Sequence, residues 1–172
     1  NKKKKFPYYS IEDLKFRLVR DTLIDKSEYE KVMFNMMKEK KFKPEKFYSS
    51  LFFNEKDLIN LDKLGHQVGL HSHNHPILME KLSYKKQKTE YEKCKSIISR
   101  ILKKSQSEIK FMSHPCGSYS QETLKILREL NIELGFKQIM TVEKEKGMIK
   151  INNSSLEIAR QDHSIITKEM KK

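Results

Sequence analysis

Four of the six histidines in this chain lie within ten residues of one another: His66, His71, His73 and His75. Alternating apolar residues just before the densest part of this cluster predict a short strand at 68–70. His71 and His75 are spaced so that one imidazole at the end of that strand and one in the following turn can converge on a single ion. Imidazole is a common ligand of zinc, and a catalytic zinc site typically combines three protein ligands with an open position for water. The spacing therefore favours a metal-dependent hydrolase.

A histidine-rich turn on a surface loop can also bind metal only adventitiously, because short motifs occur by chance. The position of other polar residues favours the functional interpretation. The histidine cluster, the segment 113–119 and the segment 160–163 each follow directly after a predicted strand. In barrels and open parallel sheets the carboxyl ends of the strands form the face on which active sites are built. We therefore expect these three segments to lie at one edge of a sheet.

The elements that would position these segments alternate between strand and helix from residue 65 onward. Strands are predicted at 68–70, 109–112, 132–136 and 156–159, with amphipathic helices between the first three. The helix before the second strand carries Tyr91, Cys94 and Ile98 on one side. Alternation of this kind is typical of parallel strands joined by crossover helices, and it predicts an α/β fold that is an open sheet or a (β/α) barrel.

The first sixty residues are predicted to be helical. Ser10 and Ser27 each begin a pattern that resembles a capping box, and Asn54 is placed to cap a third helix that ends at Gly65. Apolar residues at helical spacing predict a core face in the second of these helices: Tyr29, Val32, Met33, Met36 and Met37. We expect a single domain, in which a helical segment at 1–64 packs on a β/α region at 65–172.

Composition narrows the classes of function. No run of about 18 apolar residues and no signal peptide is visible, so the sequence predicts a cytoplasmic protein without a membrane partner. Two cysteines give no disulfide framework. The net charge of +13 raises nucleic acid as a partner, but the lysines are interleaved with glutamates on predicted helix faces and form no arginine-rich or aromatic patch. We therefore expect no nucleic-acid partner.

The segment 65–76 resembles the metal motif of the polysaccharide deacetylases (carbohydrate esterase family four), in which H-[ST]-x-x-H follows an apolar strand. The segment 113–119 resembles the third motif of that family, R-x-P-[YF]-G. The resemblance extends from Gly65 to about Arg160. It implies a partial or distorted (β/α) barrel that removes an acetyl group from an N-acetylated sugar or polysaccharide, with a carbohydrate as the substrate.

The resemblance also implies which residues bind the metal. His71 and His75 match the two histidine ligands of Zn²⁺ or another divalent metal, and Ser72 matches the hydroxyl residue that supports the loop by hydrogen bonding. The third ligand is open. His73 is one alternative, although a polar loop residue is the simpler interpretation, and Asp162 can replace a missing carboxylate only if its loop folds inward.

The chemistry of acyl transfer is assigned in the same way. The main-chain N–H of Cys116, at the family's Tyr/Phe position, would donate to the oxyanion of the tetrahedral intermediate. Ser113 stands where the family usually has an arginine, for which Arg160 is a candidate substitute. His163 is a candidate general acid for the leaving amine, or a surface histidine. Cys116 near His114 also allows a cysteine nucleophile, but a Pro-Cys-Gly turn more often positions main chain than thiol.

One departure from the family pattern affects the activity. The first motif of the family, T-F-D-D, supplies the catalytic base and an aspartate ligand, and no Asp-Asp pair occurs in this sequence. The chain opens on Asn1 rather than methionine, so we expect either that the missing strand precedes Asn1 or that the chain is a degenerate relative. Two alternatives to an active enzyme follow: a non-catalytic carbohydrate-binding remnant, and a basic nucleic-acid-binding α/β protein.

Overall fold

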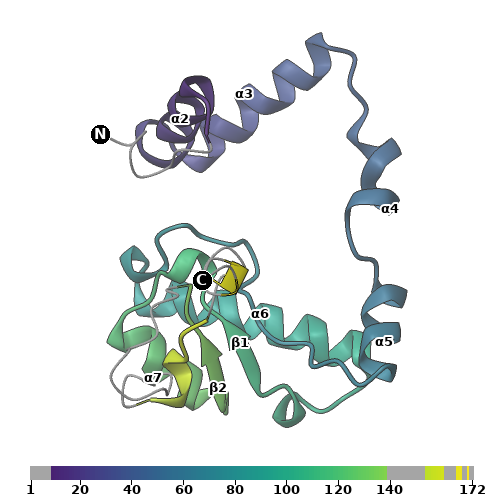
Figure 1. Ribbon diagram of the computed structural model, residues 1–172, viewed down its shortest axis with the longest axis vertical. Helices are drawn as coiled ribbons and strands as arrows, with labels where there is room; N and C mark the ends of the chain where they lie inside the picture. Colours follow the sequence, from purple (N-terminus) through teal and green to yellow (C-terminus); the bar gives the residue numbers. More distant parts are fainter. Residues whose placement is uncertain (1–8, 139–153, 161–165, 168–169, 171–172) are drawn as a thin grey trace. The chain divides into compact units, whose positions relative to one another are not determined.

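The computed structural model describes residues 9–138, 154–160, 166, 167 and 170. The chain divides into two compact units, Asn1–Phe52 and Phe53–Lys172 (Figure 1). Asp162 and His163 lie outside the described residues. No helix in the described ranges is both long enough and apolar enough to span a membrane.

Short helices make up the described part of the first unit: α2 (Ile11–Leu18), the π-helix η1 (Val19–Leu23), α3 (Lys26–Glu39), the 3₁₀ turn η2 (Pro44–Phe47) and α4 (Tyr48–Leu51). The capping box predicted at Ser10 is confirmed, because Ser10 Oγ accepts the N–H of Asp13 at 3.0 Å and the Asp13 carboxylate accepts the N–H of Ser10 at 3.2 Å. The box predicted at Ser27 is wrong. Asp25 caps α3 instead, because its carboxylate reaches the N–H of Glu28 at 2.9 Å and offers the same three-residue spacing two positions earlier.

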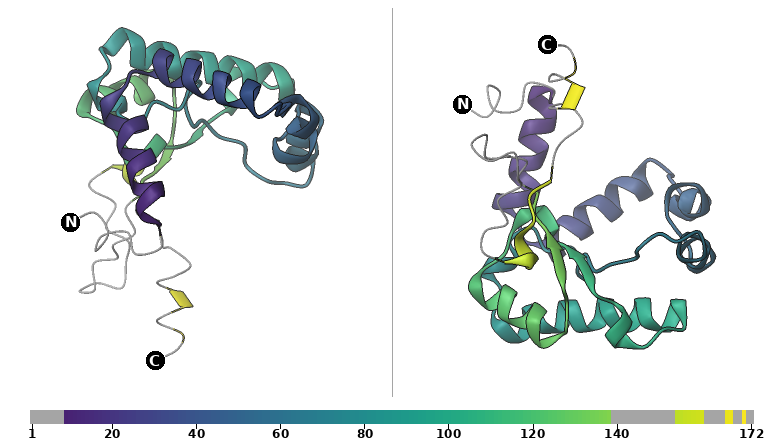
Figure 2. Two further views of the ribbon diagram at one scale, coloured as in Figure 1. Left: turned by 90° about the horizontal axis from the view of Figure 1, so that it is seen from above. Right: turned by 60° about the horizontal axis from the view of Figure 1, so that its bottom comes forward.

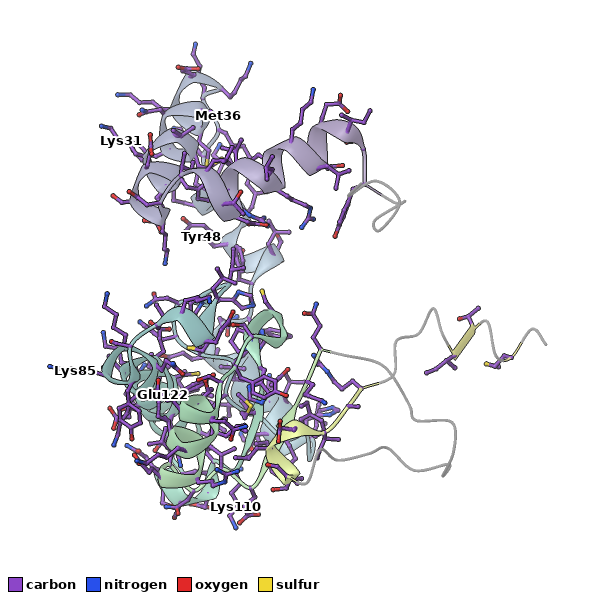
Figure 3. The ribbon with its side chains drawn as sticks, turned by 90° about the vertical axis from the view of Figure 1, so that its left-hand side faces the viewer. Lys31, Met36, Tyr48, Lys85, Lys110 and Glu122 are labelled. Atoms are coloured by element: carbon purple, nitrogen blue, oxygen red, sulfur yellow. The ribbon has the colours of Figure 1, made fainter. Side chains whose placement is uncertain are left out.

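The core face predicted in α3 is only partly covered, because Tyr29, Met33 and Met37 are half-buried whereas Val32 and Met36 are exposed. No described residue of α2 or α3 is buried, and the side chains of Val32 and Met36 are 45% and 50% exposed. Figure 3 labels Met36 beside Lys31 on this helix. Helical spacing identifies an apolar face, but it does not reveal whether another element covers that face.

The second unit contains the strands and the longer helices: α5 (Glu55–Lys63), η3 (Met79–Lys81), α6 (Tyr84–Leu102), η4 (Gln106–Glu108), β1 (Phe111–Ser113), η5 (Pro115–Gly117), α7 (Gln121–Glu129), β2 (Leu134–Phe136) and η6 (Ser155–Glu157). Asn54 caps α5 as predicted, and Gly65 follows its end with a φ of 87°. The N–H groups of Gly65 and His66 return to the last turn of α5, which is the pattern of a Schellman motif. Helix α5 contacts α6 and so belongs to the second unit, although it falls inside the predicted helical segment 1–64.

The sheet is parallel, as the alternation of elements predicted. Strands β1 and β2 pair in parallel register, with Met112 opposite Gly135, and lie side by side in Figures 1 and 2. Leu70 forms an isolated parallel bridge to Met112, and Ile158 forms another to Phe136. Four parallel segments therefore lie next to one another in the order in which the chain visits them.

All four predicted strands are shorter than expected, and two of them are reduced to single bridges. The strand at 68–70 is reduced to a bridge at Leu70, and the strand at 156–159 is reduced to a bridge at Ile158 that follows η6. Ser154 Oγ accepts the N–H of Leu156 at 3.1 Å, and this local bond closes a turn before the chain extends. Among the described residues the sheet is open, so the α/β class is confirmed but a closed barrel is not formed there.

The core of the second unit lies among α6, α7 and the strands, and α6 and α7 contact each other. Tyr91 and Ile98 are buried on the face of α6 that the sequence predicted, and Cys94 is half-buried beside them. Lys95 is buried on the same face, where its Nζ donates to the main-chain oxygen of Leu130, whereas Lys85 is exposed and points outward in Figure 3. Neither Cys94 nor Cys116 forms a disulfide within the described part of the chain.

Candidate functional site

Two of the three segments predicted to share one edge of the sheet lie together: the histidine loop and the segment 113–119. His71 directly follows the bridge at Leu70, and its Nδ1 lies 2.8 Å from the main-chain oxygen of Ser113 at the end of β1. The next residue of that loop, His114, donates its N–H to the oxygen of Phe136 at the end of β2. Because the strands are parallel, these are all carboxyl ends, where polar side chains from separate segments can meet.

His71 and His75 form the centre of the site. Their Nε2 atoms are 3.1 Å apart, and their ring centroids are 4.8 Å apart at an interplanar angle of 60°. Two imidazole nitrogens on one tetrahedral zinc ion would be about 3.3 Å apart, given Zn–N bonds of about 2.0–2.1 Å. Since the Ser113 oxygen can only accept, His71 Nδ1 carries the proton and its Nε2 keeps a lone pair for a metal. The pair therefore fits two ligands of one divalent ion.

The loop between the two histidines has an unusual backbone. Ser72 and His75 adopt left-handed conformations, with φ of 64° and 51°. Non-glycine residues rarely adopt this conformation and persist in it where surrounding contacts hold them. Ser72 Oγ accepts the N–H of His75 at 3.0 Å, so the supporting hydrogen bond predicted for Ser72 is confirmed.

Glu90, on α6, is a site residue that the sequence reasoning missed. Its Oε2 accepts the main-chain N–H groups of His73 at 3.1 Å and Asn74 at 2.7 Å, and its Oε1 accepts Asn74 Nδ2 at 2.7 Å. Partial burial alone would raise the pKa of Glu90, but these hydrogen bonds outweigh burial and lower it, which favours the charged carboxylate.

Helix α6 touches the same loop at a second point. One turn after Glu90 lies Cys94, where burial raises the pKa of the thiol and outweighs the lowering effect of the nearby main chain of His71. Cys94 was assigned to the inward side of this helix, and residues four apart lie on the same face. That spacing is the signal that could have directed attention to Glu90.

No third ligand joins the histidine pair among the described residues, because no group of three His, Cys, Asp or Glu side chains there could hold an ion. His73, the alternative third ligand, instead directs its main-chain N–H to Glu90. The other alternative, Asp162, lies outside the described residues. Among the described residues, the two imidazoles of His71 and His75 are therefore the candidate ligands.

The second loop is a tight turn around Cys116. Cys116 is exposed and has a left-handed conformation with φ of 52° and ψ of 14°, within η5. The N–H of Gly117 returns to the oxygen of His114 at 3.1 Å and closes the turn. The backbone of this turn is held in a sparsely populated conformation, and the role predicted for the main-chain N–H of Cys116 stays a prediction.

His114 is buried beneath this turn and is 1% exposed. Its Nε2 donates to the main-chain oxygen of Leu156 at 2.8 Å, and its ring stacks on Tyr119 at 4.4 Å between centroids. Tyr119 in turn donates its hydroxyl to Glu157 at 2.9 Å. Burial lowers the pKa of His114 and favours the neutral imidazole.

Arg160 lies at the same edge, two residues after the bridge at Ile158. Its side chain is anchored by a hydrogen bond from Nε to the main-chain oxygen of Lys137 at 2.7 Å. His163 lies outside the described residues, so its role as a general acid stays a prediction. The position of Arg160 is compatible with a site at the carboxyl ends of the strands, and its catalytic role also stays a prediction.

Comparison with known proteins defines the class to which the chain belongs. Residues 17–135, more than half of the sequence, match the model of the polysaccharide deacetylase family, and the chain therefore belongs to that family. Among solved structures the fold is similar to that of the Streptococcus pyogenes deacetylase PplD in complex with acetate, with 22% sequence identity and a TM-score of 0.56. That similarity covers 93% of this chain and 76% of the other. A search of curated protein sequences finds no match.

Proposed function

We propose that this chain acts as a metal-dependent deacetylase that removes an acetyl group from an N-acetylated sugar or polysaccharide. The observation that supports the proposal best is the 3.1 Å approach of His71 Nε2 and His75 Nε2 at the carboxyl edge of a parallel sheet, in a member of the polysaccharide deacetylase family. The main-chain oxygen of Ser113 also fixes the tautomer of the His71 ring. A histidine-rich surface turn that binds metal only by chance would not require such a contact.

In this proposal His71 and His75 hold a divalent ion, with zinc as the first candidate. When bound, such an ion lowers the pKa of a coordinated water to about 7 and polarises the acetyl carbonyl. The chain contributes the orientation of the ligands. Ser113 fixes the ring of His71 from one side, and Ser72 fixes the backbone of His75 from the other. The remaining ligands are not among the described residues.

The other proposed roles belong to residues at the same edge. The main-chain N–H of Cys116 would donate to the oxyanion, a contribution of about 3–4 kcal/mol in comparable hydrolases. Arg160 would take the place of the arginine that Ser113 replaces in the family motif, and His163 would protonate the leaving amine. The substrate is a carbohydrate, and neither nucleic acid nor a membrane is proposed as a partner.

The experiment that tests this function measures acetate released from an oligomer of N-acetylglucosamine in the presence of Zn²⁺. We expect acetate release that is lost in His71→Ala and in His75→Ala. His66→Ala is the matched control, because His66 is exposed and its main-chain N–H is bonded within the end of α5. Acetate release that persists in both site variants, or that is absent while zinc binds the histidine pair, would contradict the proposal.

A further inference from the structure

We propose that Glu90 is a positioning residue that holds the histidine loop, and with it His75, in the geometry that binds a metal. The inference rests on the proposed function of His71 and His75 as metal ligands. It gives helix α6 a role in the site. Glu90 lies outside the histidine motif at 65–76, because it is 16 residues beyond Asn74 in sequence.

The contacts of Glu90 span the middle of the loop. One carboxylate oxygen binds two consecutive main-chain N–H groups, those of His73 and Asn74, and the other binds the side-chain amide of Asn74. Both residues lie between the two ligands. A single side chain thus fixes the position and the direction of the peptide units that connect His71 to His75.

The loop needs such an anchor because its backbone is strained. Ser72 and His75 on either side of the anchored residues have positive φ, a conformation that costs about 1–2 kcal/mol for a residue with a Cβ. The N–H groups of residues 73, 74 and 75 are all bound by side chains rather than by a sheet or helix, two of them by Glu90 and one by Ser72. Without Glu90, the loop would lose the contacts that hold the 3.1 Å approach of the two rings.

The anchor is itself rigid. Glu90 sits within the 19-residue helix α6, next to Tyr91, which is fully buried. One turn later the half-buried Cys94 lies near the main chain of His71, so α6 lies beside the loop at a second point. Supporting residues of this kind orient metal-binding histidines, and their removal typically costs about 10–100-fold in metal affinity.

The first test measures the affinity for Co²⁺ by its visible absorption. We expect Glu90→Ala to weaken binding by about 10–100-fold, in line with the loss of supporting contacts at other metal sites. Glu92→Ala is the matched control, because Glu92 lies on the same helix but is exposed and has no hydrogen bond to the loop. Its affinity should stay within about twofold of the wild type, because it removes a charge from α6 without touching the loop.

The second test reverses the polarity of one bond. Asn74→Asp would place a second carboxylate against Glu90, so two acceptors meet where the Asn74 amide now donates at 2.7 Å. Adding Glu90→Gln to that variant restores one donor and one acceptor. We expect Asn74→Asp to weaken Co²⁺ binding and the double variant to recover most of the loss. A residue that only stabilised the fold would show no such recovery.

A third measurement needs no metal. Amide hydrogen exchange at His73 and Asn74 in the metal-free chain should accelerate by at least about tenfold in Glu90→Ala, because both amides lose their acceptor, and should be unchanged in Glu92→Ala. If the wild type binds no Co²⁺, the proposed function fails. If amide exchange at His73 and Asn74 is also unchanged in Glu90→Ala, the inference is overturned as well. If the wild type binds Co²⁺ and Glu90→Ala binds it equally well, the inference is overturned while the proposed function stands.

Discussion

The buried imidazole of His114 should make the stability of the second unit depend on pH. Its Nε2 donates to the oxygen of Leu156, so its Nδ1 carries the lone pair, and that atom is buried without a hydrogen-bond partner among the described residues. Protonation would place a charge and a new N–H in a site that offers no acceptor. This is the physical reason why burial lowers the pKa of His114 in the folded chain.

The magnitude follows from proton linkage. In the unfolded chain a histidine titrates near pH 6.5, whereas the pKa in the folded chain is lower. The unfolded state therefore binds more protons in this range, and the free energy of unfolding falls as the pH falls below about 6.5. One histidine with a strongly lowered pKa contributes a loss of up to about 1.4 kcal/mol between pH 7.5 and pH 5.5.

The assay is urea unfolding followed by circular dichroism at pH 7.5 and pH 5.5. We expect His114→Phe to be less stable at pH 7.5 by about 1–3 kcal/mol, because the oxygen of Leu156 loses its donor. Its further loss on acidification should be smaller than that of the wild type by up to about 1.4 kcal/mol. His66→Ala, at an exposed histidine, is the control and should keep the wild-type pH dependence. An equal loss in His114→Phe and the wild type would refute the reasoning.

Three further changes test the packing around the site. In Gly69→Ala the new methyl would lie 2.6 Å from the main-chain oxygen of Phe111, so we expect the free energy of unfolding in urea to fall by about 1–3 kcal/mol and metal binding at the displaced loop to weaken. An unchanged free energy of unfolding would contradict the close approach. Asn54→Ala removes the acceptor for two N–H groups of α5 and should cost about 1 kcal/mol in the same assay, with no loss if the cap is unimportant. Tyr91→Phe should be neutral or stabilising, because the Tyr91 hydroxyl is buried without a hydrogen-bond partner among the described residues; a loss above about 1 kcal/mol would show that it has one.

Much of the local structure could be predicted because its signals are short-range. The caps at Ser10 and Asn54 and the helix end at Gly65 depend on residues within a few positions of one another, and all are present. The start of α3 shows the limit of such patterns. Asp25 and Ser27 are both possible cap residues two positions apart, and the side chain of Asp25 is the one that caps the helix. The parallel order of the strands followed from their alternation with helices.

What could not be predicted depends on contacts between residues far apart in sequence. The apolar face of α3 was assigned to a core, yet Met36 is half exposed, because periodicity cannot show what lies opposite a helix. The convergence of His71 and His75 followed from their spacing, whereas Glu90 is absent from the motif and meets the loop only through the fold. The same holds for the bond between His114 and Leu156, which are 42 residues apart.

The central claim is that His71 and His75 form one metal site. Titration calorimetry with Zn²⁺ near pH 7 tests it most directly, on the wild-type chain, on the His71→Ala/His75→Ala double variant and on the His66→Ala control. The account predicts one-to-one binding in the wild type and the control and no such binding in the double variant. Equal binding in all three chains, or no binding in the wild type, would contradict it.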